Sequence, residues 1–182
     1  LVEALVKEGC EVRAMTMYNS FNNWGWLDQL DTKLLKDIEV YPGDMRDIKS
    51  VKNSCHNIDI VFHLASLIAI PQSYYSPYAY LETNAKGILN LLESSLDSSI
   101  SKIIHTSTSE VYGEYDSVPI SELNKNIARS PYSATKIAAD QLAYSYFSTY
   151  DLPVSIIRPF NTFGPRQSNR AIIPTIITQV LN

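Results

Sequence analysis

Short apolar runs along the chain alternate with longer segments in which apolar residues recur every three or four positions. The short runs predict strands at residues 11–17, 38–41, 58–64, 102–107 and 154–158. The longer segments predict helices at residues 1–9, 26–35, 48–55, 78–96 and 131–150, with a further apolar periodic segment at 172–182. This alternation predicts a parallel sheet covered on both faces, which is the doubly wound α/β class.

Both ends of the chain lie inside apolar periodic segments. Leu1, Val2, Leu5 and Val6 share one face of a helix, and Gly9 is suited to end it. The first residues are therefore interpreted as the second half of a helix. Residues 172–182 stop in the same way. We therefore expect further chain on both sides of residues 1–182.

Composition narrows the classes of partner. A hydrophobic content of 45%, a net charge of −4 and a pI of about 5.3 are typical of a globular domain and provide no basic face for nucleic acid. Cys10 and Cys55 are too few for a disulfide framework and have no metal-ligand spacing, which predicts a reducing cytoplasm and no metal. The apolar run at 60–70 is interrupted by His63 and Ser66 and is too short for a bilayer, so no membrane partner is expected.

Tyr132 and Lys136 are the first candidates for chemistry. They are four positions apart on a predicted helix, so they share a face. A lysine ammonium beside a phenol favours the phenolate, which can take a proton from a substrate hydroxyl while a nicotinamide takes the hydride. Because the chain holds 12 tyrosines, such a pair can also arise by chance.

Hydroxyls and a carboxylate follow the buried strand predicted at 102–107. The Thr108 or Ser109 hydroxyl can bridge a substrate oxygen to Tyr132, and Glu110 can act at a substrate carbon or hydroxyl. The alternative is a polar turn that caps a short helix, with Glu110 in solvent.

Two further segments follow the strands at 58–64 and 38–41. The small residues of Leu64-Ala65-Ser66 would let cofactor phosphates approach the backbone, whereas His63 is interpreted as a core histidine. Asp44 can accept a hydrogen bond from an adenine amino group, although a turn and a helix cap supplied by Asp47 explain that segment equally well.

The last candidate segment is the loop at 158–167, whose path is restricted by two prolines and a glycine. Asn161 and Arg166 can bind a sugar and a diphosphate, or the loop can be a rigid part of the surface. In doubly wound folds, ligands bind beyond the carboxyl ends of the strands. All the candidate segments follow predicted strands or lie on the helix that faces that edge, so one shared site is expected.

Together these motifs resemble the extended short-chain dehydrogenase/reductase family of NAD-dependent nucleotide-sugar epimerases and dehydratases, over essentially the whole chain. Tyr132 and Lys136 match the family's Tyr-x-x-x-Lys pair. Residues 108–113, Thr-Ser-Glu-Val-Tyr-Gly, are similar to the 4,6-dehydratase and decarboxylase branches, whereas a 4-epimerase is expected to lack Glu110. The resemblance implies a Rossmann fold that is truncated at both ends, without its first strand, its Gly-rich loop and most of its C-terminal substrate domain. By itself, the piece is expected to be inactive.

The resemblance also implies the partners and the site. The expected partners are NAD and a nucleotide sugar, and the full-length protein is expected to be a homodimer. NADP stays open, because Met15 or Thr16 stands where an acid usually holds the NAD ribose. The implied site consists of catalytic Thr108, Ser109, Glu110, Tyr132 and Lys136; cofactor-binding Asp44, Met45, Leu64, Ala65, Ser66, Tyr132, Lys136 and Pro159; and substrate-binding Asn84, Asn161 and Arg166.

Within the family, residues 18–28, 66–71 and 170–174 resemble the 4,6-dehydratase of legionaminic-acid-type nonulosonate biosynthesis, which acts on nucleotide-linked N-acetylglucosamine. Such an enzyme would oxidise C4 of the sugar, remove water across C5 and C6, and return the hydride to C6. Ser109 stands where many dehydratases carry Asp, so Glu110 is expected to serve as both base and acid. The alternatives are a decarboxylase, a 4-epimerase and a non-catalytic dinucleotide-binding protein.

Overall fold

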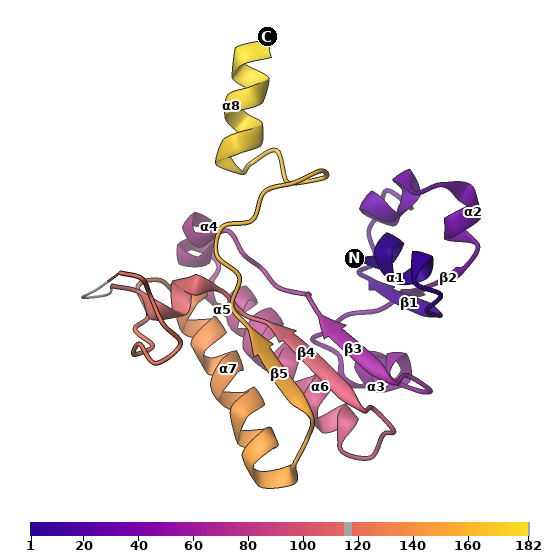
Figure 1. Ribbon diagram of the computed structural model, residues 1–182, viewed down its shortest axis with the longest axis horizontal. Coiled ribbons are helices and arrows are strands. Elements are labelled where there is room, and N and C mark those ends of the chain that lie inside the picture. The colour runs from indigo at the N-terminus through magenta and orange to yellow at the C-terminus, as the bar shows by residue number, and fades with distance from the viewer. Residues whose placement is uncertain (115–117, 182) are drawn as a thin grey trace.

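The computed structural model describes residues 1–114 and 118–181, and its five strands form two parallel sheets (Figure 1). In one sheet β1 (Val12–Thr16) pairs with β2 (Ile38–Pro42), and in the other β4 (Lys102–Thr106) lies between β3 (Ile60–His63) and β5 (Val154–Ile157). The prediction that β3, β4 and β5 are neighbouring parallel strands is confirmed, as is the doubly wound class.

Helices and short helical turns lie between the strands. The turns are the 3-10 turns η1 (Gly25–Gln29) and η3 (Ser109–Tyr112) and the π-helical turn η2 (Leu81–Lys86). The α-helices are α1 (Val2–Lys7), α2 (Thr32–Leu35), α3 (Ile48–Ser54), α4 (Ile70–Tyr75), α5 (Pro77–Tyr80), α6 (Gly87–Ser95), α7 (Pro131–Tyr150) and α8 (Ile172–Leu181). Asn182, the end of the segment predicted at 172–182, lies outside the described residues. In the described part of the chain, no helix has the length and apolar character needed to cross a membrane.

The chain passes from one sheet to the other between β2 and β3, which is where we place the topological switch of the doubly wound fold. The chain steps from β1 to β2 in one sheet and then from β3 through β4 to β5 in the other. In doubly wound folds the carboxyl ends of the strands at such a switch form the ligand-binding edge. The candidate segments after β2, β3, β4 and β5 therefore all lie at the carboxyl ends of these strands.

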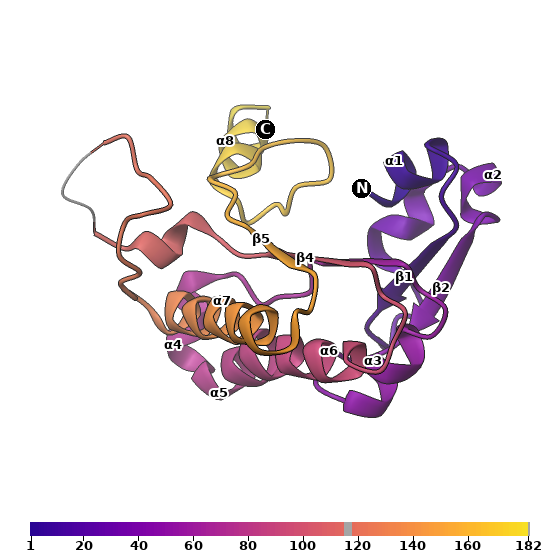
Figure 2. The same cartoon turned by 60° about the horizontal axis from the view of Figure 1, so that its bottom comes forward.

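Within the described residues, the outer strands of the sheet of β3, β4 and β5 are partly exposed, so their expected burial on both faces is not observed. Figure 2 shows α3, α6 and α7 together on one face of these strands. Ile60 and Ile157 are consequently 50% and 45% exposed. The apolar core lies on the covered face, where Ile88 and Leu92 of α6 pack with Ile103 of β4.

Two predicted helices are interrupted, and in each case a side chain supplies the reason. The helix predicted at 78–96 contains the π-helical turn η2, where Asn84 turns its amide toward Leu67 and Thr135. The helix predicted at 26–35 is divided into η1 and α2, because the Asp31 side chain accepts a hydrogen bond from Lys33 N and so starts a new helix. Helix α4 was not predicted.

Candidate active site

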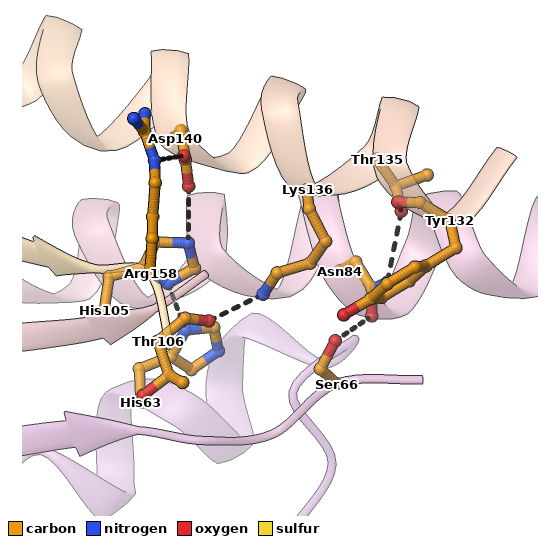
Figure 3. A network of polar contacts seen from close by, with 10 residues as sticks. All are labelled: His63, Ser66, Asn84, His105, Thr106, Tyr132, Thr135, Lys136, Asp140 and Arg158. Atoms are coloured by element: carbon orange, nitrogen blue, oxygen red, sulfur yellow. Dashed lines mark hydrogen bonds and ion pairs between the residues drawn. The ribbon is translucent and has the colours of Figure 1, made fainter. Parts of the chain in front are cut away.

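Helix α7 holds the two candidate catalytic residues in fixed positions. Ser130 and Ser133 form a capping box at its first turn, and Pro131 adds the φ angle that a helix start requires. Tyr132 therefore lies in the first turn and Lys136 one turn later, both on the buried side of the helix at 7% and 2% exposed. Figure 3 shows both side chains reaching from α7 toward the ends of β3 and β4.

The turn η3 places the Thr108 hydroxyl and the Glu110 carboxylate near the Tyr132 phenol. Burial raises the pKa of Tyr132, a hydrogen bond with Thr108 opposes that rise, and the charge of Glu110 adds to it. The Tyr80 ring packs edge-on against the Tyr132 ring, with 6.3 Å between their centroids. Thr108, Glu110 and Tyr132 thus form one cluster.

The same turn also contains a helix cap. The interpretation of this segment as a capping turn and its interpretation as a site segment are therefore compatible. The Thr108 side chain accepts a hydrogen bond from Glu110 N at 3.2 Å, and Ser109 N donates to the Pro159 carbonyl at 3.2 Å. Gly113 ends the turn at φ +58°, where a Cβ atom would lie 2.1 Å from the Ile127 carbonyl oxygen. Only glycine fits at position 113. Glu110 of the same turn is exposed and lies at the edge of the cluster.

The expected effect of Lys136 on Tyr132 is not present. Lys136 Nζ donates a hydrogen bond to the Thr106 carbonyl at 2.7 Å, at the end of β4. Burial lowers the pKa of Lys136 to about 8, against the charge of Asp140, which raises it. Since the ammonium is directed to Thr106, burial dominates at Tyr132 and the pKa of the phenol is raised instead of lowered.

A buried chain of polar groups continues from this point into the protein (Figure 3). His63 and His105 face each other in the β3–β4 register, with 2.9 Å between their Nδ1 atoms. His105 Nε2 lies 3.4 Å from Asp140 Oδ1, and Arg158 Nε donates to Asp140 Oδ2 at 2.9 Å. If His105 directs Nε2–H to the carboxylate, its Nδ1 is the acceptor and His63 carries the shared proton on Nδ1, so both rings are neutral.

The interpretation of His63 as a core histidine is confirmed, and it leads to a prediction about stability. Burial lowers the pKa of both His63 and His105. The unfolded chain takes up protons below about pH 6.5 and the folded chain does not, so the free energy of unfolding is expected to fall with decreasing pH. The expected slope approaches about 1.4 kcal/mol per pH unit for each buried histidine.

Urea unfolding of the full-length protein between about pH 7.5 and about pH 5.5 measures this slope. The exposed His56 provides the control, because His56→Gln is expected to leave the slope unchanged. A free energy of unfolding that stays constant over this range would show that the two buried histidines can take up protons in the folded state.

The loop after β3, which is the candidate phosphate-binding loop, has two exposed residues followed by one that is hydrogen-bonded to the protein interior. Leu64 and Ala65 are exposed at the carboxyl end of the strand. The Ser66 hydroxyl donates to Asn84 Oδ1 at 2.9 Å, and the Asn84 amide also contacts both backbone groups of Leu67. With Thr135 as its fourth partner, Asn84 is 1% exposed and fully hydrogen-bonded within the protein. In this structure Asn84 fastens the loop to α7, and its expected role in substrate binding stays a prediction.

The candidate adenine-binding residues follow β2. Arg46 holds the Asp44 carboxylate, with 2.6 Å between Nη2 and Oδ2, and this pairing lowers the pKa of Asp44. Met45 packs against the apolar core and accepts a hydrogen bond from Asn90 through its carbonyl. Asp47 caps α3, as predicted. Because Arg46 already occupies part of the Asp44 carboxylate, fewer of its hydrogen-bond acceptor sites are free for an adenine amino group.

Arg166, one of the two candidates in the loop after β5, has a φ of +65° and forms an ion pair with Glu3 of α1 at 3.2 Å. Asn161 is exposed. The structure places Arg158 at the site, where it also donates to the Tyr112 hydroxyl at 3.1 Å.

His105 and Asp140 were missed by the sequence reasoning. Two signals could have identified them: His105 occupies the position of β4 that corresponds to His63 on β3, and Asp140 is one helical turn beyond Lys136. The first signal depends on the pairing of strands, which the sequence gives only indirectly, whereas the second can be read from the helix period alone.

The parallel sheet with its switch point and the Tyr132–Lys136 pair define a Rossmann domain of the short-chain dehydrogenase/reductase type. The chain belongs to the family described as GDP-mannose 4,6 dehydratase, which matches residues 1–182. Over 170 residues it is 35% identical to the low-salt glycan biosynthesis protein Agl12 of Haloferax volcanii, covering 93% of this chain and 53% of the relative. The chain therefore spans about half the length of that relative.

Solved structures agree with this family. The dTDP-glucose 4,6-dehydratase DesIV of Streptomyces venezuelae, solved with NAD bound, superimposes with a TM-score of 0.82 at 26% identity, covering 99% of this chain and 57% of that one. The UDP-N-acetylglucosamine 4-epimerase of Methanobrevibacter ruminantium gives a TM-score of 0.88 at 29% identity, covering 100% and 58%. Dehydratases and epimerases are thus both among the similar structures.

Proposed function

We propose that the chain carries the catalytic centre of an NAD-dependent nucleotide-sugar 4,6-dehydratase. Its substrate is a nucleotide-linked N-acetylglucosamine, and its product is the 4-keto-6-deoxy sugar. The observation that carries this proposal is that the Glu110 carboxylate and the Thr108 hydroxyl both lie close enough to the Tyr132 phenol to change its pKa. An acid–base group for C4 and a second one for C5 are what an oxidation followed by an elimination requires.

The residues around the switch point fit a dinucleotide. Leu64 and Ala65 leave exposed backbone at the carboxyl end of β3, where a phosphate can approach. Lys136 uses one of its three N–H groups on Thr106, which leaves two for the hydroxyls of a ribose. NAD would be held by these groups, by Tyr132 and by Pro159, and when bound it supplies the acceptor and later the donor of the hydride.

The side chains would then act in sequence on the sugar. Tyr132 takes the O4 proton through Thr108 as C4 is oxidised to a ketone, which acidifies the C5 proton. Glu110 removes that proton and delivers it to the C6 hydroxyl, which leaves as water. A hydride returns to C6, and the proton stored at Tyr132, or a solvent proton exchanged for it, is added at C5. The overall change is the loss of one water.

A 4-epimerase is the second candidate, because an epimerase is among the similar structures. Epimerisation requires proton transfer at O4 by Tyr132 and has no step at C5. Glu110 would therefore have no catalytic role in an epimerase. A decarboxylase would instead need a cationic group for a C6 carboxylate.

Mass spectrometry of the full-length protein incubated with NAD and a panel of nucleotide sugars tests the proposal. A 4,6-dehydratase produces the mass of the substrate less one water. An unchanged mass with a new C4 configuration would show an epimerase, and the loss of carbon dioxide would show a decarboxylase. Conversion of a nucleotide-linked N-acetylglucosamine would support the finer assignment to nonulosonate biosynthesis.

We also propose that the full-length protein is a cytoplasmic homodimer. Helix α5 and the turn η2 that continues it pack against α7, and these elements carry the exposed apolar side chains of Tyr78, Leu81 and Tyr144. Such a surface is typical of a protein interface. Both cysteines are free thiols, in keeping with a reducing compartment. Light scattering of the full-length protein and of Leu81→Glu measures the dimer, which the variant is expected to weaken.

A further inference from the structure

Asp140 is a buried carboxylate that the proposed reaction does not use. It lies on α7 one helical turn beyond Lys136, and the two side chains are 1% and 2% exposed. Residues at this spacing are neighbours on a helix face. A buried lysine ammonium is unfavourable without an opposite charge nearby, and the charge of Asp140 raises the pKa of Lys136.

Three elements hold Asp140 in place. Arg158 at the end of β5 donates to one carboxylate oxygen at 2.9 Å, and His105 on β4 lies 3.4 Å from the other. Lys136, on the same helix as Asp140, reaches the carbonyl of Thr106, the residue after His105. Figure 3 shows Lys136 between Tyr132 on one side and the Asp140 contacts on the other.

We infer that Asp140 is a positioning residue: its charge keeps Lys136 protonated and fixed at the end of β4, where Lys136 can bind the ribose of the cofactor. This inference rests on the proposed function, because binding the ribose is the task of Lys136 in it. A neutral lysine amine would serve this purpose less well. Asp140 itself touches no reacting atom.

The other ionisable groups around Lys136 do not replace Asp140. His63 on β3 and His105 on β4 interact with the Lys136 charge, but burial lowers the pKa of both rings, so they stay neutral. Tyr132 precedes Lys136 on α7, and Glu110 of η3 acts on Tyr132. Burial lowers the pKa of Lys136 to about 8, and the charge that opposes this effect is that of Asp140.

The test compares Asp140→Asn with Asp151→Asn in the full-length protein. Asp151 is the exposed C-terminal cap of α7, and asparagine tolerates its left-handed φ of +54°, so this control makes the same chemical change outside the network. The titration of Lys136 is followed by NMR of protein labelled with carbon-13 at lysine Cε, and the signal is assigned by its absence in Lys136→Met. In Asp140→Asn the midpoint is expected to fall by about 1 pH unit, and in the control it should not move.

The reaction provides the second readout. In Asp140→Asn the alkaline limb of the pH profile for cofactor reduction is expected to move down with the Lys136 titration, while Asp140→Glu restores part of it. If the Lys136 midpoint is unchanged, or if it falls while the pH profile stays the same, Asp140 does not position Lys136. If Asp140→Asn does not fold, Asp140→Asn/Arg158→Gln removes both charges of the ion pair, and the Lys136 midpoint is expected to fall by less than in the single variant, because loss of a nearby positive charge raises the pKa of a lysine. A parent protein that converts no nucleotide sugar would refute the proposed function, and the NMR titration would still decide the coupling.

Discussion

Replacing Tyr132 with phenylalanine in the full-length protein is expected to reduce the rate of cofactor reduction by about 10²- to 10⁴-fold, the range for loss of a positioned acid–base group. The phenylalanine ring keeps the packing against Tyr80, so the fold should persist. The loss would therefore reside in kcat and not in the stability of the protein. Absorbance of reduced cofactor after rapid mixing with substrate measures the step.

Tyr150→Phe is the matched control, because Tyr150 lies at the other end of α7 and is 57% exposed. It should behave as the parent protein. If Tyr132→Phe also oxidises the sugar at the parent rate, the proton from O4 goes to another group, and the role proposed for the Thr108–Tyr132 pair is wrong.

Glu110→Gln is expected to separate the two halves of the reaction. The C4 oxidation uses Tyr132 and Thr108, so reduced cofactor should still form on mixing. Elimination requires a base at C5, so the loss of water is expected to slow by about 10²- to 10⁴-fold, and reduced cofactor should persist. Product mass and cofactor absorbance recorded in the same reaction measure both halves.

Glu122→Gln makes the same change at an exposed position of the loop between η3 and α7, and it should dehydrate the substrate normally. Dehydration at the parent rate by Glu110→Gln would exclude Glu110 as the base. A variant that forms no reduced cofactor at all would place Glu110 in the oxidation step instead.

Much of the candidate site could be predicted from sequence because its elements are local. Helix α7 was predicted with the bounds that the structure has, since Ser130, Pro131 and the apolar period define it within the segment itself. The carboxyl ends of parallel strands necessarily share an edge, so Thr108 and Tyr132 could be expected to meet. The interrupted helix at η2 could not be predicted, because its cause is a hydrogen bond from Asn84 to Thr135, 51 positions away.

The sequence by itself determined the class of fold, the family and the residues at the centre of the site, because periodicity, helix caps and strand ends are properties of neighbouring positions. The tertiary structure decided how those residues are used. It directed Lys136 to the Thr106 carbonyl, enclosed Asn84 within the protein and drew Arg166 to Glu3. It also placed His63, His105, Asp140 and Arg158 in one buried chain. The physical reason is that burial and the pairing of distant elements set the hydrogen-bond partner and the charge of a side chain, and neither can be read from its neighbours in sequence.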